Sequence, residues 1–151
     1  MGSHAEGRST TASGEASHAE GYSTGSSGNY SHAEGKSTTA FGESSHAGGE
    51  SSIATGKISF AHGYFLRAQG ENQAVFGKYN STNTTDIFQI GGGTSDTNRK
   101  NIFSIDTDGD AQISKSLNIG GLSDNTGEAH TLFVSGPAYF LAGVDTDANY
   151  V

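Results

Sequence analysis

Small residues recur along the first half of the chain with a period of seven. An alanine stands two positions before nearly every glycine of this series, and Ser26 and Val75 replace it at the two exceptions. The periodic glycines are Gly7, Gly14, Gly21, Gly28, Gly35, Gly42, Gly49, Gly56, Gly63, Gly70 and Gly77. A fixed short period of this kind indicates a repeat architecture built from one structural unit.

A second period of fourteen residues lies over the first. The motif SHAEG begins at Ser3, Ser17 and Ser31, and the degenerate copies SHAGG and SFAHG begin at Ser45 and Ser59. A heptad coiled coil needs large apolar residues at two of its seven positions, whereas the repeated residues here are Ala and Gly. Each glycine would cost a helix about 1 kcal/mol, and Ser, Thr and Asn compete for its backbone hydrogen bonds. The pattern therefore predicts short strands and tight turns.

The alternation within SHAEG predicts how each strand is oriented. Ser, Ala and Gly share one face, His and Glu share the other, and Gly supplies turn conformations that other residues avoid. Each fourteen-residue unit forms one coil with two short strands, and coils stacked about 4.8 Å apart pair every strand with its copy. We predict a parallel β-solenoid over residues 3–80 with a narrow interior of Ala and Ser. Because such an interior buries little apolar area, we also expect self-association.

Large apolar residues become frequent only toward the end of the repeat. Before residue 59 the aromatic residues are Tyr22, Tyr30 and Phe41. In the later coils we assign to the core Phe60, Phe65, Leu66, Val75 and Phe76.

The repeat stops after Asn80, and a connector is predicted over residues 81–101. Within it, Ile87, Phe88 and Ile90 are followed by three glycines, which predicts a strand and a turn. Apolar residues then occupy odd positions from Phe103 to residue 119 and even positions from 132 to 144. This alternation predicts strands with one buried face, so residues 102–151 form a second β region, and helix content should be minimal.

The motifs SHAEG, TASG, TAFG and IATG resemble the SxAxG repeats of the trimeric autotransporter head. The specific motifs SHAEG and STTASG are followed by the segments FGKYN and GGGTSDTNRKNIFSIDTDGDA. Together they more closely resemble tail-fibre and other appendage proteins of phages and prophages of Gram-positive bacteria. The resemblance covers roughly residues 3–113. Adhesin heads usually carry Val and Ile where this chain has rows of His and Glu.

The resemblance implies an all-β homotrimer. Its repeat domain would be a left-handed parallel β-roll of fourteen-residue coils, followed by a small stem of the β-prism or β-sandwich type. In that stem, residues 102–151, three chains would intertwine and trimerise. The implied function is that of a structural and receptor-binding segment of a phage tail fibre, part of a virion assembled in the host cytoplasm. Its partners would be a glycan or protein receptor on the bacterial cell surface and other tail proteins of the virion. The alternative is a head fragment of a trimeric adhesin on the bacterial surface.

Charge and composition limit the classes of partner that this chain is expected to bind. The chain of 151 residues has 8 Lys and Arg against 16 Asp and Glu, a formal net charge of −8, which gives 3 × −8 = −24 for three chains. This charge argues against nucleic-acid binding. Arg67, Arg99 and Lys100 are the candidates for a local basic spot. No apolar run reaches the roughly 20 residues that span a bilayer, so no membrane segment is expected. The absence of Cys excludes disulfides and thiolate metal sites.

The recurring His and Glu residues are the first candidate site. Coil stacking should arrange them as a ladder of His4, His18, His32 and His46 with Glu6, Glu20 and Glu34. Zinc or nickel could in principle bind between imidazoles, but no pair has the spacing HxH or HxxxH. We therefore favour a hydrogen-bonded ladder that fixes coil register and is sensitive to mildly acidic pH, and we assign no metal or cofactor.

Other motifs give weaker candidates. Identical SHAEG copies argue against one catalytic centre, so no enzyme is expected. Asp106, Asp108 and Asp110 resemble the start of a calcium loop, but Gly109 does not stand at the position that an EF-hand requires, and an Asp-Gly hairpin turn is favoured. Exposed aromatic faces suit sugar rings, so the candidate ligand-binding residues are Tyr22, Tyr30, Tyr64 and Tyr79. Packing at a trimer seam is the alternative for these tyrosines.

An ice-binding surface is a further alternative, because such solenoids present flat rows of threonine. The threonines that hint at one are Thr10, Thr11, Thr24, Thr38 and Thr39. The row fails at Ser52 and Leu66, so we favour attachment instead.

Overall fold

The computed structural model describes residues 2–115, and its elements in this part are all β-strands. The even-numbered apolar row at 132–144 and most of the expected stem lie outside the described residues. The strands are β1 (His4–Arg8), β2 (Thr11–Ala12), β3 (His18–Tyr22), β4 (Gly25–Ser26), β5 (His32–Ala33), β6 (Thr39–Ala40), β7 (His46–Glu50), β8 (Ile53–Ala54), β9 (Phe60–Tyr64), β10 (Arg67–Ala68), β11 (Ala74–Lys78), β12 (Asp86–Gly92), β13 (Asn101–Asp106) and β14 (Ala111–Ile113).

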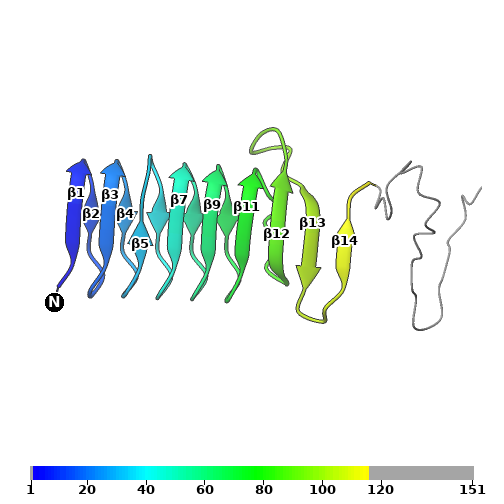
Figure 1. The fold of residues 1–151 in the computed structure, drawn as a ribbon, viewed down its shortest axis with the longest axis horizontal. Coiled ribbons are helices and arrows are strands. Elements are labelled where there is room, and N and C mark those ends of the chain that lie inside the picture. Colours follow the sequence, from blue (N-terminus) through cyan, green and yellow to red (C-terminus); the bar gives the residue numbers. More distant parts are fainter. Residues whose placement is uncertain (1, 116–151) are drawn as a thin grey trace, which may run out of the picture. The chain divides into compact units, whose positions relative to one another are not determined.

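Strands β1 to β12 form a parallel solenoid whose coils repeat every fourteen residues, and β13 and β14 extend the longer sheet by antiparallel pairing. Within the described residues, the longer sheet has the order β1-β3-β5-β7-β9-β11-β12-β13-β14 and the shorter sheet β10-β8-β6-β4-β2 (Figure 1). The register pairs each residue with its copy fourteen positions later, as His4 with His18. The predicted all-β fold with fourteen-residue coils is confirmed. None of the described residues forms a helix that could cross a bilayer.

The interior of the roll is lined by small side chains. Fully buried alanines stack in two rows, one from each sheet: Ala19, Ala33, Ala47 and Ala61, and Ala40, Ala54 and Ala68. Buried serines lie between them, and Ser31 Oγ donates a hydrogen bond to the Gly28 carbonyl oxygen at 2.6 Å. The narrow Ala and Ser interior expected from the repeat is present.

The assignment of large apolar residues to the core is only partly right. Leu66 and Val75 are fully buried. Phe60 and Phe65 are half-buried and Phe76 is exposed. The register places Phe60 and Phe76 in the outward rows that His46 and His62 occupy.

The periodic glycines have two different roles. Gly7, Gly21 and their copies every fourteen residues have positive φ angles, 107° and 106° at these two. Gly28 does not have positive φ, but a Cβ there would overlap the carbonyl oxygen of Gly42 in the next coil. This second set of glycines therefore serves close packing between coils and not a left-handed backbone.

Each turn also contains a residue other than glycine in the left-handed conformation. It lies two positions after each periodic glycine, as at Tyr30 with φ of 59° and Ile58 with φ of 55°. Such a conformation costs an L-residue about 1 kcal/mol. Each turn also gains a hydrogen bond between coils, since Tyr30 N–H donates to the Glu15 carbonyl at 2.7 Å and Ile58 N–H to the Glu43 carbonyl at 2.8 Å.

A buried polar cluster lies where the coils pass into the final strands. Gln89 occupies the position that Val75 and Ala61 hold in the coils before it. Its Oε1 accepts a hydrogen bond from Asn80 Nδ2 at 2.6 Å, and the side chain of Gln73 donates to the Asp86 carbonyl at 2.7 Å. These buried amide groups have hydrogen-bond partners, so they can cover the interior at the end of the roll without a loss of hydrogen bonds. The sheet continues through β12, so the range expected as a connector contains the strand that the sequence indicated.

We expect Gly28→Ala to lower the free energy of unfolding by about 3 kcal/mol, because the added methyl overlaps a backbone oxygen that cannot move independently. Gly25→Ala is the matched control: its Cβ would lie 3.6 Å from Thr39 Cγ2, an ordinary contact. The control should be neutral or stabilising by at most about 1 kcal/mol. Denaturant unfolding of both variants measures the difference, and equal losses would contradict the close packing of coils.

Candidate functional site

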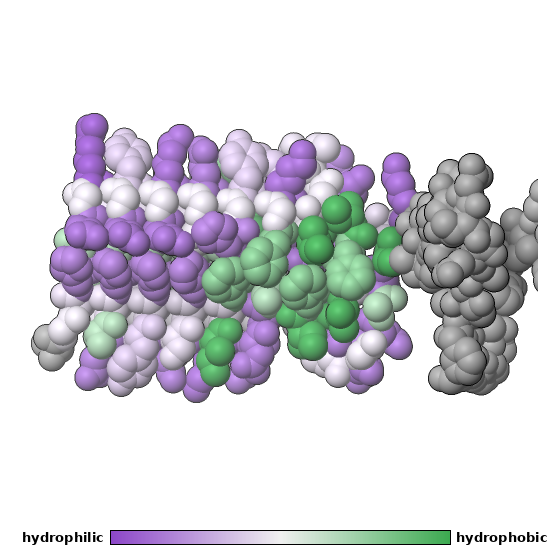
Figure 2. Space-filling view, in the orientation of Figure 1, coloured by the Kyte–Doolittle hydropathy of each residue, from purple (hydrophilic) through white to green (hydrophobic). Residues whose placement is uncertain are grey.

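The outer face of the longer sheet carries two kinds of surface. Over its first coils lie rows of hydrophilic residues, and these pass into an apolar area over β9 to β14 (Figure 2). We call the first part the ladder; it comprises His4, His18, His32, His46, Glu6, Glu20 and Glu34. We call the second part the apolar patch; it comprises Phe60, Phe76, Phe88, Ile90, Phe103 and Ile113.

The histidines of the ladder stack on one another, as their register requires. Ring centroids are 5.1 Å apart between His4 and His18 and 4.8 Å apart between His18 and His32, whose rings are parallel within 2°. The His46 ring is turned by 77° relative to His32 and stacks on Phe60 at 4.8 Å. The regular stack therefore ends at His46.

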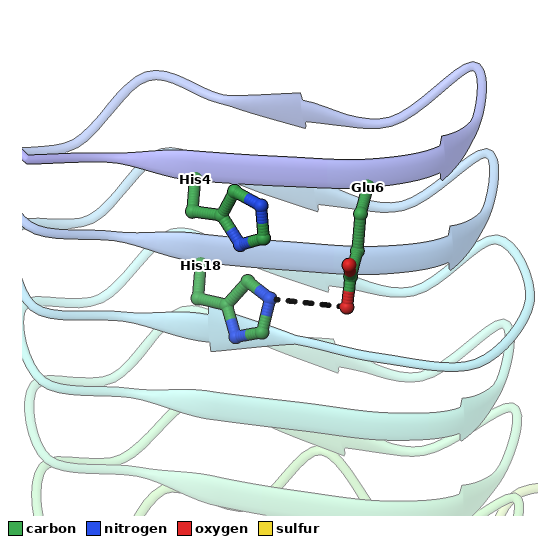
Figure 3. Close-up of side chains that lie close together, drawn as sticks. All are labelled: His4, Glu6 and His18. Atoms are coloured by element: carbon green, nitrogen blue, oxygen red, sulfur yellow. Dashed lines mark ion pairs between the residues drawn. The ribbon is translucent and has the colours of Figure 1, made fainter.

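Each glutamate of the ladder faces the histidine of the following coil. Figure 3 shows Glu6 beside His18, with Oε1 and Nε2 3.8 Å apart. The corresponding distance is 3.4 Å for Glu20 and His32 and 3.2 Å for Glu34 and His46. The structure thus brings together the residues that the sequence predicted to meet. The Nε2 atoms of His18 and His32 are nevertheless buried without a hydrogen-bond partner, since their carboxylates are too distant or poorly aligned.

The pKa of His46 is lowered from its ordinary value. Burial disfavours the charged imidazole, and the neighbouring His32 adds to this effect, whereas the Glu34 carboxylate acts in the opposite direction. Burial outweighs the ion pair, so the pKa of His46 lies below that of an ordinary histidine and its ring stays neutral to a lower pH.

Sequence reasoning missed His62, which approaches the last glutamate of the ladder. Its Nδ1 lies 3.6 Å from Glu34 Oε1. His62 stands two coils after Glu34 in the same row, and Gly48 stands between them. The sequence signal for His62 lies in the degenerate copies SHAGG and SFAHG, in which Gly48 and His62 replace the glutamate of SHAEG.

The apolar patch is a continuous run of aromatic contacts. Ring centroids are 5.3 Å apart between Phe60 and Phe76, 5.9 Å between Phe76 and Phe88, and 6.0 Å between Phe88 and Phe103. Ile113 of β14 pairs with Phe103 and extends the patch. The sequence did not reveal this surface, because its members belong to a repeat, a presumed connector and a second region.

The four candidate tyrosines do not form one site. Tyr64 and Tyr79 meet with ring centroids 5.5 Å apart, and Phe65 stacks on Tyr79 at 5.1 Å. Tyr79 is half-buried, contrary to the exposed position expected for it. Tyr22 and Tyr30 are exposed and lie in earlier coils.

The expected basic spot is largely neutralised. Asp96 forms ion pairs with Arg99 and, at 3.2 Å, with Arg67. The hydrogen bond from Arg99 is the main cause that lowers the pKa of Asp96. Arg99 also donates to the Phe65 carbonyl at 2.8 Å, which holds the loop before β13 against the coil.

The remaining candidates have structural explanations. Asp106 Oδ1 accepts backbone hydrogen bonds from Asp108 at 3.0 Å and Asp110 at 2.9 Å, in the turn between β13 and β14. The predicted Asp-Gly hairpin turn is therefore confirmed. Two of the five expected threonines, Thr24 and Thr38, are buried, so the flat exposed threonine row that the ice-binding alternative requires is not present among them. No pocket is found among residues 2–115.

Comparison with known proteins gives one match. Residues 33–57, from β5 to just after β8, are similar to two copies of the YadA head domain repeat. No curated protein and no solved structure matches the chain. The matched segment contains Glu34, His46 and Gly48.

We expect the pKa of His46 to lie below 6.5, the value of an unperturbed histidine. The unfolded chain then binds the proton more readily than the folded chain. The stability contributed by neutral His46 is present above about pH 6.5 and is lost as the pH falls through the folded pKa. An NMR titration of the histidine ring protons measures this value. Glu34→Gln removes the carboxylate that favours the charged form and should lower the pKa further; a His46 pKa above 6.5 would contradict the effect of burial.

Proposed function

We propose that this chain is a non-enzymatic attachment segment of a trimeric fibre. The observation that carries the proposal is the apolar patch, which lies on the outer face of a solenoid whose residues 33–57 match the YadA head domain repeat. YadA-like heads are homotrimeric, which is consistent with three copies of this chain packing together. The coils would form a stiff spacer, and the outer surfaces away from the seam would be left for contacts.

The apolar patch supports association between copies. Large exposed apolar areas are uncommon on monomeric soluble proteins and mark interaction sites. Its aromatic side chains lie on the flat outer face of the sheet, and Phe76 and Ile113 remain 38% and 40% exposed in the single chain. Packing this face against two further copies would bury them, and it would supply the apolar burial that the alanine interior lacks.

For the biological setting, we propose a phage or prophage tail fibre that binds the bacterial cell surface. The resemblance of the motifs from SHAEG to DTDGDA to such appendages supports it. The head fragment of a bacterial adhesin is the second candidate, and the YadA head repeats in residues 33–57 favour it. Both candidates use the protein as a binding module and differ in the surface that is bound.

We expect the protein to have the mass of three chains in solution, as measured by light scattering. Phe76→Glu should give a monomer, because it places a charge at the centre of the apolar patch. Phe41→Glu is the control: Phe41 is more exposed, at 55%, but follows β6 in the shorter sheet, outside the patch. Monomeric wild-type protein, or equal dissociation of both variants, would overturn the proposed seam.

We expect labelled protein to bind purified bacterial cell walls, and Tyr64→Ala to weaken this binding at least fivefold. Tyr64 is exposed and belongs to the aromatic cluster with Phe65 and Tyr79, which offers ring faces to a sugar. Tyr22→Ala is the control, since Tyr22 is equally exposed at 43% but lies outside this cluster. Binding to vertebrate extracellular matrix and not to cell walls would favour the adhesin.

A further inference from the structure

Three groups of His and Glu on the ladder face have ligand atoms within 4.8 Å of one another. They are His4, Glu6 and His18; His18, Glu20 and His32; and Glu34, His46 and His62. The first two belong to regular SHAEG copies. The third arises only where the repeat changes, because Gly48 and His62 stand at positions that hold glutamate in the earlier coils.

The regular groups are poorly arranged for a shared ion. The lone pair of an imidazole nitrogen lies in the plane of its ring, so two ligating rings need planes that intersect at the ion. His18 and His32 are parallel within 2° with centroids 4.8 Å apart, so their planes do not converge. His4 and His18 are also stacked, at 23°. These pairs favour stacking over joint coordination.

The third group has the geometry that the others lack. The rings of His46 and His62 are tilted by 37° with centroids 6.2 Å apart, so they are not stacked as the parallel rings of His18 and His32 are. Glu34 Oε1 lies 3.2 Å from His46 Nε2 and 3.6 Å from His62 Nδ1. Zinc bonds of about 2.1 Å in a tetrahedron place neighbouring ligand atoms about 3.4 Å apart. Both measured distances are close to that edge.

Gly48 makes room for this arrangement. A Cβ at this position would overlap His62 Nδ1 and lie 3.1 Å from Glu34 Oε1. The φ of Gly48 is not positive, so the backbone does not require glycine there. Glycine at this place in the row thus leaves free the space between the three ligands. Phe60, which follows His46 in the same row and belongs to the same strand as His62, stacks on the His46 ring at 4.8 Å.

We propose that Glu34, His46 and His62 bind one divalent zinc-type ion per chain. Two imidazole nitrogens and one carboxylate oxygen form a ligand set that suits zinc better than magnesium or calcium, which prefer oxygen ligands. Three protein ligands leave a fourth position to water. His62 is exposed, so the ion enters directly from solvent. The site connects three successive coils, and zinc therefore stabilises their stacking at the border between the ladder and the apolar patch.

The test is zinc titration of the full chain by calorimetry, with cobalt absorption as a report of tetrahedral coordination. We expect one zinc ion per chain, no comparable binding of magnesium or calcium, and a zinc-dependent rise in melting temperature. His62→Asn and Gly48→Ala should each weaken zinc binding at least tenfold. Gly48→Ala is the sharper variant, since it removes no ligand and only fills the space between them.

His18→Asn is the matched control, because it removes a ladder histidine from the two regular groups and leaves the third intact. It should bind zinc as the wild type does. Absence of zinc binding by the wild type would overturn the proposal, and so would a loss in His18→Asn as large as in His62→Asn. Circular dichroism without zinc checks that each variant is folded. If Gly48→Ala is not folded, zinc binding by His62→Asn decides the test, because His62 is exposed. Neither the readout nor the variants depend on trimer formation or receptor binding, so the outcome is independent of the proposed function.

Discussion

Hydrogen bonding between coils at one fixed spacing is the constraint on which the rest of this structure depends. Parallel pairing puts each residue beside its copy fourteen positions later, so the equivalent side chains of successive coils form a row along the solenoid. Rows facing inward must be small, because the two sheets of a coil lie close together. Rows facing outward are unconstrained by packing inside the chain, and their chemistry is free to change from coil to coil.

This constraint limits how the protein is stabilised. The interior contains mostly alanine and serine, so apolar burial within one chain is modest and backbone hydrogen bonds between coils carry much of the order. Turn residues adopt a costly left-handed conformation, and the hydrogen bonds between coils offset this cost. The buried amides of Gln73, Asn80 and Gln89 then close the end of the roll, where a further alanine coil would leave an open interior.

The outer face of the longer sheet shows how function can be added to such a scaffold. Apolar residues in the outward rows, with Phe60 and Phe88 in the histidine row and Phe76 and Ile90 in the glutamate row, turn a polar ladder into an apolar patch while the parallel register is kept. Changing a glutamate to glycine and the next to histidine gathers Glu34, His46 and His62 in one place. Departures from the repeat are therefore more informative about function than the repeat itself, although they resemble loss of pattern in the sequence.

The sequence by itself determined the coil length, the inward rows of Ala and Ser, the outward rows of His and Glu, and the hairpin at Asp106, because each follows from periodicity or local turn chemistry. Only the tertiary structure decided which residues take the left-handed turn position, since that depends on a carbonyl in the preceding coil. It also placed Phe60 and Phe76 outside and Leu66 inside, because the register aligns the two phenylalanines with the outward row positions of His46 and His62. Finally, ring tilt and the space beside Gly48 distinguish one His and Glu group from two others of similar composition, and neither property can be read from residue spacing.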